Sequence, residues 1–288
     1  MTLKQFCEPY DWSEIDAEVA DTGAVILTGF LGSSRVDTLN ADVENYLQSV
    51  SSVDGQLPGL PATGSSIYNQ FLGYQTLRLH GLLEKLPAVH SVLGSSSLLG
   101  WAERLLGPVA TQPRLSAAEL IQIQPGEPRQ AAHRDSDSWP LPIGDAPFVV
   151  NAIIALSDFT ATNGGTWVAP GSWRWPADRT YSSSDFVQSQ MSAGDALLFR
   201  GDLVHGAGAN DSDAHRRALS ISFCAGWLRG VENCALNLSL QTVRGLSRDL
   251  QAVLGFAAYD GSARGTGLLG LYENGDPAQA LVVTDVSD

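Results

Sequence analysis

Short apolar segments separated by Gly and Pro fill the chain from residue 115 onward, and this spacing constrains the fold more than any other feature. With 29 Gly and 14 Pro in 288 residues, turn-forming residues interrupt nearly every apolar segment. Closely spaced strands of this kind predict an all-β sandwich or barrel. The predicted strands lie at 118–124, 148–156, 165–169, 195–199 and 217–223.

The residues before 115 have a different pattern, which predicts helices beside the β core. Apolar residues recur with helical spacing at 13–20, 34–50, 77–86 and 95–106, around one strand at 24–27. A Ser-, Gly- and Pro-rich stretch at 51–66 predicts a loop. We therefore expect one domain over 1–288, mainly β with flanking helices. Its parts are a helical flank at about 1–114, a core at about 115–230 and a C-terminal segment at about 231–288.

Two histidines and one aspartate form a candidate metal site. His133 and Asp135 are separated by one residue, so on an extended strand their side chains point to the same face. Such a pair arises readily by chance, and a lone His near a strand is more often a packed residue than a ligand. His205, after the predicted strand at 195–199, supplies a third ligand. Two imidazoles and one carboxylate are the facial ligand set of non-haem Fe(II) oxygenases.

Arg216 and Arg217 open the predicted strand at 217–223, and we expect one of the two guanidinium groups to point inward. A buried guanidinium needs an anionic partner, because an unpaired buried charge is costly, and its planar fork matches a carboxylate. A dicarboxylate cosubstrate would supply that anion. The alternative is a structural Arg paired with an Asp, or a solvated pair of Arg on an edge strand. The metal set favours the first interpretation.

Four motifs occur in the order typical of one enzyme family. They are His133-Arg-Asp135, Asn163-Gly-Gly-Thr-Trp-Val-Ala-Pro-Gly-Ser172, Gly194-Asp-Ala-Leu-Leu-Phe199, and His205-Gly-Ala-Gly-Ala-Asn210 followed by Arg216. Together they resemble the phytanoyl-CoA dioxygenase-like (PhyH) branch of the Fe(II)/2-oxoglutarate-dependent oxygenases. Gln130 and Thr166 make the chain most similar to the fungal dioxygenases of meroterpenoid and alkaloid biosynthesis.

The resemblance implies a double-stranded β-helix, the jelly-roll or cupin-like fold, for the core. It also implies a catalytic Fe(II) bound by His133, Asp135 and His205. The 2-oxoglutarate cosubstrate would be bound by four residues: Arg216, Gln130, Thr166 and Arg78. One departure concerns Trp173, which follows Pro-Gly-Ser where the family usually has His. This departure affects a contact beside the site and leaves the metal set intact.

The resemblance further implies that dioxygen oxidises a small-molecule substrate by hydroxylation, desaturation, rearrangement or endoperoxidation. Four Trp near the metal pair predict a broad pocket for a bulky apolar molecule, such as a terpenoid- or alkaloid-type natural product. These are Trp139, Trp167, Trp173 and Trp175. Alternatively, the same side chains belong to the core or to surface turns. Two other functions stay open: a non-catalytic metal-binding jelly-roll protein, and a cupin-like oxygenase that needs no 2-oxoglutarate.

Composition narrows the partners and the location. A net charge of −14 argues against binding to nucleic acid or to an anionic membrane surface. The three Cys have no C-x-x-C spacing, and we find no signal peptide or membrane-spanning apolar stretch. We therefore expect a cytoplasmic protein. From the resemblance we also expect a homodimer to which the C-terminal segment contributes.

Overall fold

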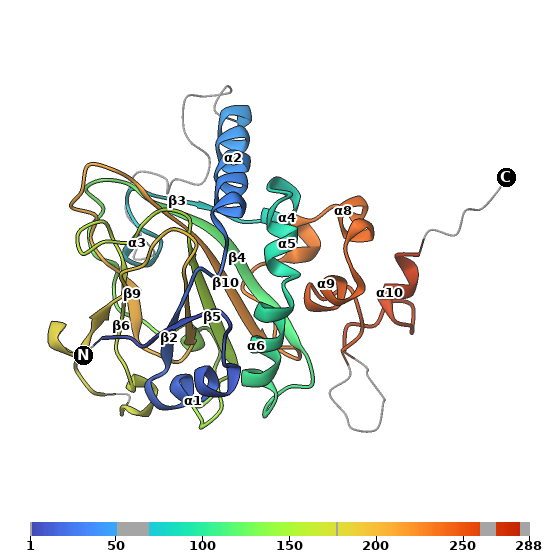
Figure 1. Cartoon of the computed structure of the whole chain (residues 1–288). Coiled ribbons are helices and arrows are strands. Elements are labelled where there is room, and N and C mark those ends of the chain that lie inside the picture. Colours follow the sequence, from blue (N-terminus) through green and yellow to red (C-terminus); the bar gives the residue numbers. More distant parts are fainter. Residues whose placement is uncertain (1, 51–68, 177, 260–268, 283–288) are drawn as a thin grey trace.

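Two β-sheets face each other at the centre of the protein (Figure 1). The computed structural model describes residues 2–50, 69–176, 178–259 and 269–282, so the predicted loop at 51–66 lies outside the described residues. The main sheet has the strand order β1-β2-β8-β5-β10-β4-β3, and the smaller sheet has the order β7-β6-β9. Neighbouring strands pair antiparallel except for β1 and β2, which are parallel. This arrangement confirms the predicted double-stranded β-helix with flanking helices.

The strands of the main sheet are β1 (Gln5–Cys7), β2 (Ala24–Thr28), β8 (Ala196–Arg200), β5 (Val149–Ala155), β10 (Arg216–Ala225), β4 (Pro113–Ile123) and β3 (Thr76–Leu79). The smaller sheet contains β7 (Val187–Gln188), β6 (Thr166–Val168) and β9 (His205–Ala207). The helices are α1 (Trp12–Thr22), α2 (Ser33–Val50), α3 (Asn69–Leu72), α4 (Leu82–Lys85), α5 (Val89–Leu93), α6 (Ser96–Leu106), α7 (Cys234–Asn237), α8 (Leu240–Gly245), α9 (Arg248–Val253) and α10 (Pro277–Ala280). None of the described helices is long and apolar enough to cross a membrane.

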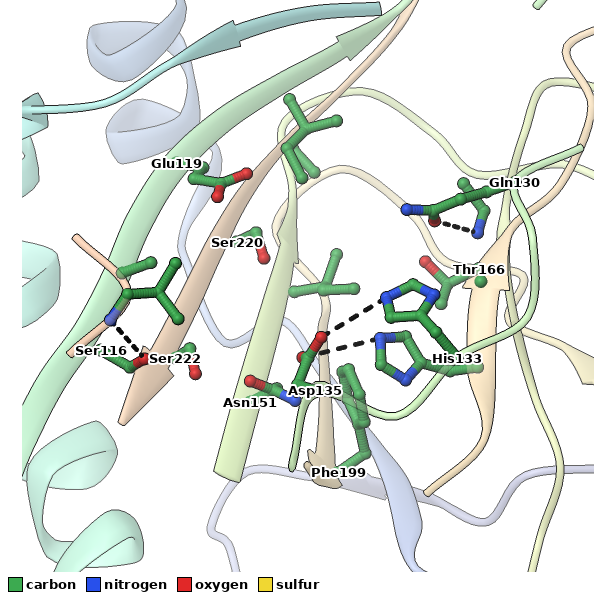
Figure 2. A pocket seen from close by; sticks show the side chains of 18 of the residues that line it. Ser116, Glu119, Gln130, His133, Asp135, Asn151, Thr166, Phe199, Ser220 and Ser222 are labelled. Atoms are coloured by element: carbon green, nitrogen blue, oxygen red, sulfur yellow. Dashed lines mark hydrogen bonds and ion pairs between the residues drawn. The ribbon is translucent and has the colours of Figure 1, made fainter. Parts of the chain in front are cut away.

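The main sheet is buried on both faces. Because successive strand residues point to opposite faces, Val150, Ala152 and Ile154 of β5 pack into the large core with helices α2, α4, α5, α6 and α9. Ile153 belongs instead to the core between the two sheets. Asn151 also points to this inner face, where it lines a cavity (Figure 2). Because of this alternation, a polar residue on the inner face of β5, such as Asn151, lies beside the cavity.

All six predicted strands are confirmed, and so are the predicted helices at 13–20, 34–50 and 95–106. The predicted helix at 77–86 is wrong, because the structure has β3 followed by α4. Leu77 and Leu79 alternate with Arg78 along β3, which pairs with the edge of β4. Gly81 adopts a left-handed conformation (φ 65°) between the two elements. The Leu spacing fits both a helix and this strand-turn-helix, and pairing with β4 selects the strand.

Candidate active site

His133, Asp135 and His205 come together at one side of the cavity between the sheets. One ligand atom from each of the three lies within 4.8 Å of the others. Arg134 between the first two is extended (φ −117°, ψ 133°), so His133 and Asp135 point to the same side as expected. Asp135, however, begins a 3₁₀ helix (Asp135–Ser138) instead of continuing a strand.

Backbone carbonyls set the orientation of both imidazole rings. Nδ1 of His133 lies 2.9 Å from the carbonyl oxygen of Ala131, and Nδ1 of His205 lies 3.0 Å from that of Leu203. An N–H donated at Nδ1 leaves the lone pair on Nε2, which is the arrangement of a metal-bound imidazole. The two Nε2 atoms lie 3.4 Å and 3.7 Å from the carboxylate oxygens of Asp135 (Figure 2). The three donors therefore converge in a way that fits Fe(II).

The electrostatics of the three residues favour the protonation states that a metal requires. Burial lowers the pKa of His205 to about 4, although the charge of Asp135 opposes this shift. Burial alone would raise the pKa of Asp135, but the charge of His205 and the contacts with His133 lower it to about 2. Burial by itself would lower the pKa of His133. The hydrogen bond to Asp135 and the charge of Asp135 outweigh this effect, so the pKa of His133 is raised. Near neutral pH, Asp135 is ionised and His205 is neutral.

Asn151 holds the carboxylate ligand and was not predicted from the sequence. Its side-chain amide on β5 donates a 2.8 Å hydrogen bond to Oδ2 of Asp135, and the residue is only 3% exposed. The available signal was one amide in the otherwise apolar strand Val149–Ala155. Buried polar side chains usually have a specific partner, which only the fold identified here.

A cavity of about 190 Å³ adjoins the three residues and receives side chains from both sheets. All four residues predicted to bind the cosubstrate line it: Arg78, Gln130, Thr166 and Arg216. A second space of about 570 Å³ opens outside the first and shares His133, Asp135 and Ser138 with it. Phe71, Tyr181 and Arg179 line this outer space. His133 and Asp135 therefore line both the inner and the outer space, whereas His205 lines the inner one.

Arg216 is a buried cation without an ion pair among the described residues. It is 2% exposed, and its Nε donates a 3.1 Å hydrogen bond to the carbonyl oxygen of Gly164, which Nη2 also contacts. The guanidinium carbon lies 4.2 Å from the centre of the Phe159 ring. Burial lowers the pKa of Arg216 to about 9, which expresses the cost of keeping this charge out of water. A bound carboxylate would offset that cost.

Arg217 points to the opposite face and matches the structural alternative. Its Nε donates a 2.8 Å hydrogen bond to Gln122, its Nη1 a 2.9 Å bond to Asn40, and its Nη2 a 2.6 Å bond to Glu44. Asn40 and Glu44 belong to α2, so Arg217 ties this helix to the sheet. Of the two adjacent cations, only Arg216 faces the cavity.

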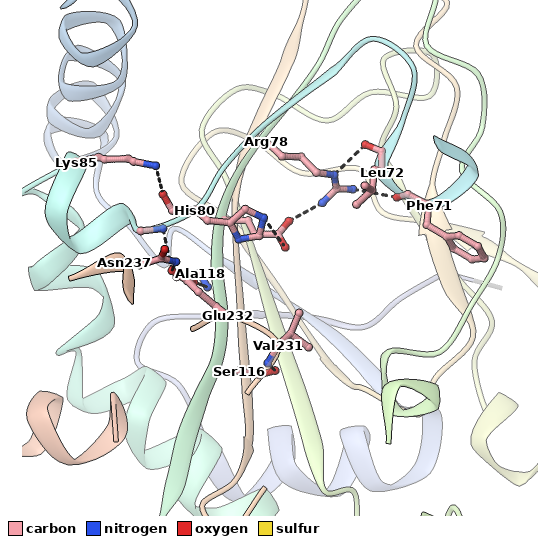
Figure 3. Close-up of polar contacts among 12 residues, drawn as sticks. Phe71, Leu72, Arg78, His80, Lys85, Ser116, Ala118, Val231, Glu232 and Asn237 are labelled. Carbon is pink, nitrogen blue, oxygen red and sulfur yellow. Dashed lines mark hydrogen bonds and ion pairs between the residues drawn. The ribbon is translucent and has the colours of Figure 1, made fainter. Parts of the chain in front are cut away.

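The other three predicted residues differ in how tightly the protein holds them. Gln130 accepts a 2.9 Å hydrogen bond from the N–H of Ala207 and donates a 2.6 Å bond to the carbonyl of Phe71. Thr166 on β6 is buried at the cavity wall. Arg78 pairs with Glu119 at 2.5 Å and donates to the Leu72 carbonyl at 2.9 Å (Figure 3).

Of the four Trp predicted to form a broad pocket, only Trp139 lines the inner cavity. Trp173 is buried in the core between the sheets, with the guanidinium groups of Arg174 and Arg200 at 4.1 Å and 4.6 Å from its ring. Trp175 stacks with Arg179, and Trp167 with Arg129. Trp173 therefore packs as a core residue at the position where the family usually has His. The prediction of an aromatic pocket is wrong for three of the four rings.

Comparisons with known proteins agree with this geometry. The family model for phytanoyl-CoA dioxygenase (PhyH) matches residues 19–218. The dioxygenase ALT11 of Alternaria alternata is 32% identical over 256 residues, which cover 84% of this chain and 81% of that protein. The dioxygenase aneA of Aspergillus aculeatus is 35% identical over 222 residues, which cover 74% of this chain and 72% of that protein.

Solved structures show the same fold. The non-haem α-ketoglutarate-dependent epimerase SnoN from nogalamycin biosynthesis superposes with a TM-score of 0.61 at 19% identity, covering 96% of this chain and 95% of SnoN. The carbocyclase SnoK from the same biosynthesis gives a TM-score of 0.57 at 24% identity, covering 77% of this chain and 88% of SnoK. The family match over residues 19–218 and the relatives ALT11 and aneA show that the chain belongs to the phytanoyl-CoA dioxygenase (PhyH) family of non-haem iron, 2-oxoglutarate-dependent dioxygenases.

Proposed function

We propose that His133, Asp135 and His205 bind Fe(II) and that Arg216 binds the distal carboxylate of 2-oxoglutarate in the adjoining cavity. One observation carries this assignment: the convergent His-Asp-His set lines the same cavity as Arg216, a buried cation that has no ion pair in the described part of the chain. Gln130, Thr166 and Arg78 are the proposed further contacts. Arg78 is already paired with Glu119, so its contact with the cosubstrate would be shared.

Iron and 2-oxoglutarate, when bound, supply the oxidising power for an unactivated C–H bond, with succinate and carbon dioxide as products. The protein's own part is to orient the reactants and limit the access of water. The carbonyls of Ala131 and Leu203 fix the imidazole rings, and Asn151 fixes the carboxylate. Arg216 would neutralise the distal carboxylate of 2-oxoglutarate at a buried position.

We further propose that the substrate is a bulky small molecule of natural-product biosynthesis, of terpenoid or alkaloid type. The support is the outer space of about 570 Å³, which adjoins the ligands and has room for a large molecule. SnoK and SnoN, which come from nogalamycin biosynthesis, support the part of the proposal that concerns natural-product biosynthesis.

The proposal is tested by incubating the purified protein with 2-oxoglutarate and oxygen and measuring succinate. We expect succinate to depend on added Fe(II) even without a substrate, at a slow rate. Binding of 2-oxoglutarate to the anaerobic Fe(II) protein should also produce a metal-to-ligand charge-transfer band. Absence of both signals in a folded protein would contradict the site assignment.

We propose that the chain forms a single domain and a homodimer in the cytoplasm. The single domain is supported by β1, β2 and β3, which come from the N-terminal flank and join the same sheet as the core strands.

Exposed apolar side chains of the C-terminal segment support a dimer contact: Leu236, Leu240, Leu269 and Tyr272. All three Cys are free, as expected in a reducing compartment. Sedimentation equilibrium would test the dimer.

A further inference from the structure

Further polar side chains of the main sheet line the inner cavity, beside the residues assigned to iron and cosubstrate. Glu119 of β4 lies directly opposite Ser220 of β10, and Ser222 lies opposite Asn151 of β5. All four line the inner cavity (Figure 2). They form a polar band over three neighbouring strands, which ends at Asn151 and its hydrogen bond to Asp135.

The acceptors of this band are only partly used by the protein. One carboxylate oxygen of Glu119 is paired with Arg78 at 2.5 Å, whereas the other lies 3.7 Å from Nε2 of His80. Within the described residues, neither Ser220 nor Ser222 makes a side-chain hydrogen bond. Groups that line a cavity and keep free hydrogen-bonding capacity are available to a ligand.

The band does not suit the cosubstrate. A dicarboxylate has only acceptors, so it gains no hydrogen bond from Glu119, while Arg216, four residues before Ser220 on β10, would attract it. The same carboxylate attracts a hydrogen-bond donor, and an ammonium group most strongly. Glu119 therefore divides the cavity into a part for the dicarboxylate and a part for a ligand with donors.

We propose that Glu119, with Ser220 and Ser222, binds a hydroxyl or protonated amine of the substrate and thereby sets which carbon meets the iron. This inference rests on the proposed function and narrows its substrate class from any bulky, largely apolar molecule to one that also carries a hydroxyl or an amine. Glu119 and Asn151 are two strand spacings and two residues of rise apart, so the substrate donor bound by Glu119 would lie roughly 12 Å from Asn151.

Three small probes of similar size test the proposal on the metal-free protein: n-hexylamine, 1-hexanol and methyl pentyl ether. Binding is followed by tryptophan fluorescence, because Trp139 lines the cavity. We expect the amine to bind at least about tenfold more tightly than the ether, with the alcohol between them. The Glu119→Gln protein should lose most of the preference for the amine. Equal binding of all three probes by the parent protein would overturn the proposal.

Two further variants separate recognition from a purely structural role. Glu103→Gln removes the same charge on an exposed part of α6 and should leave the probe order unchanged. Ser220→Ala leaves the Arg78–Glu119 pair intact, so it remains informative if Glu119→Gln fails to fold, and it should weaken both donor probes about threefold. If Glu119 serves only to hold Arg78, Glu119→Gln will weaken 2-oxoglutarate binding and leave the probe order unchanged, which would also overturn the proposal.

The binding test needs no iron and no turnover. A protein that shows the amine preference but forms no Fe(II)-dependent succinate would contradict the proposed function alone. A protein that forms succinate but treats the three probes alike would contradict this inference alone.

Discussion

His133 and His205 are joined backbone to backbone: each N–H donates a 2.9 Å hydrogen bond to the carbonyl oxygen of the other. The two residues are far apart in sequence, yet this antiparallel bridge brings their rings to a centroid separation of 4.5 Å. Movement of one imidazole is therefore coupled to the other through the main chain. A metal bound between them would meet a preorganised pair, which reduces the cost of assembling the site.

Replacing a proposed ligand should abolish iron-dependent chemistry. We expect His133→Ala and Asp135→Ala to lower the Fe(II)-dependent formation of succinate more than about 100-fold, since even residues behind the ligands contribute about 10–100-fold. Circular dichroism should show that both variants remain folded. Chelation of the parent protein should have the same effect, reversed by added Fe(II). Undiminished succinate formation by either variant would show that the ligands are assigned wrongly.

Arg216 and Arg217 offer a matched pair of variants. Arg216→Ala removes the cation that faces the cavity, and we expect the charge-transfer band with 2-oxoglutarate to be lost at concentrations that saturate the parent. Arg217→Ala removes three side-chain contacts on the other face, so it should lower the free energy of unfolding by about 3 kcal/mol and keep the band. Urea titration and anaerobic absorption spectra measure the two effects. A band that survives in Arg216→Ala would remove this residue from the site.

Asn151→Ala should weaken metal binding without removing a ligand. Its amide fixes the carboxylate of Asp135, and loss of such support costs about 10–100-fold in affinity. Titration with Co(II), followed by its visible spectrum, gives the dissociation constant. Asn40→Ala is the control, because its amide donates to the Leu156 carbonyl on the opposite face of the sheet. Equal affinities in the two variants would rule out the positioning role of Asn151.

Metal binding should weaken as the pH falls. The pKa of His133 is raised above its ordinary value of 6.5, so below that pKa the metal must displace one proton from the imidazole. His205 and Asp135, with pKa values of about 4 and about 2, add no proton in this range. We expect affinity for Co(II) to fall about tenfold per pH unit on the acid side of the His133 titration. An affinity that does not change between about pH 5 and 7 would contradict this protonation scheme.

Two kinds of feature could be predicted from the sequence: elements with a local pattern of apolar and turn residues, and site residues that belong to the ordered motifs. The strands from 115 onward follow directly from apolar runs between turn residues, and the fold then brought together every residue proposed for the metal and the cosubstrate. The helix predicted at 77–86 failed because β3 depends on pairing with β4, which is distant in sequence. Asn151 and Glu119 were missed for the same reason. Their surroundings depend on cross-strand register, which a single sequence does not encode locally.

Arg216 and Arg217 point to opposite faces of the sheet, so the register of β10 decides which of the two lines the cavity. A shift of one residue in the pairing of β10 would turn Arg216 toward the helices. The same shift would turn Arg217, which contacts α2, into the cavity. Insertions or deletions within β10 would therefore be tolerated only in pairs, whereas the 208–215 connection before it is free of this restriction. Comparison of relatives would consequently show no single-residue insertion or deletion within this strand.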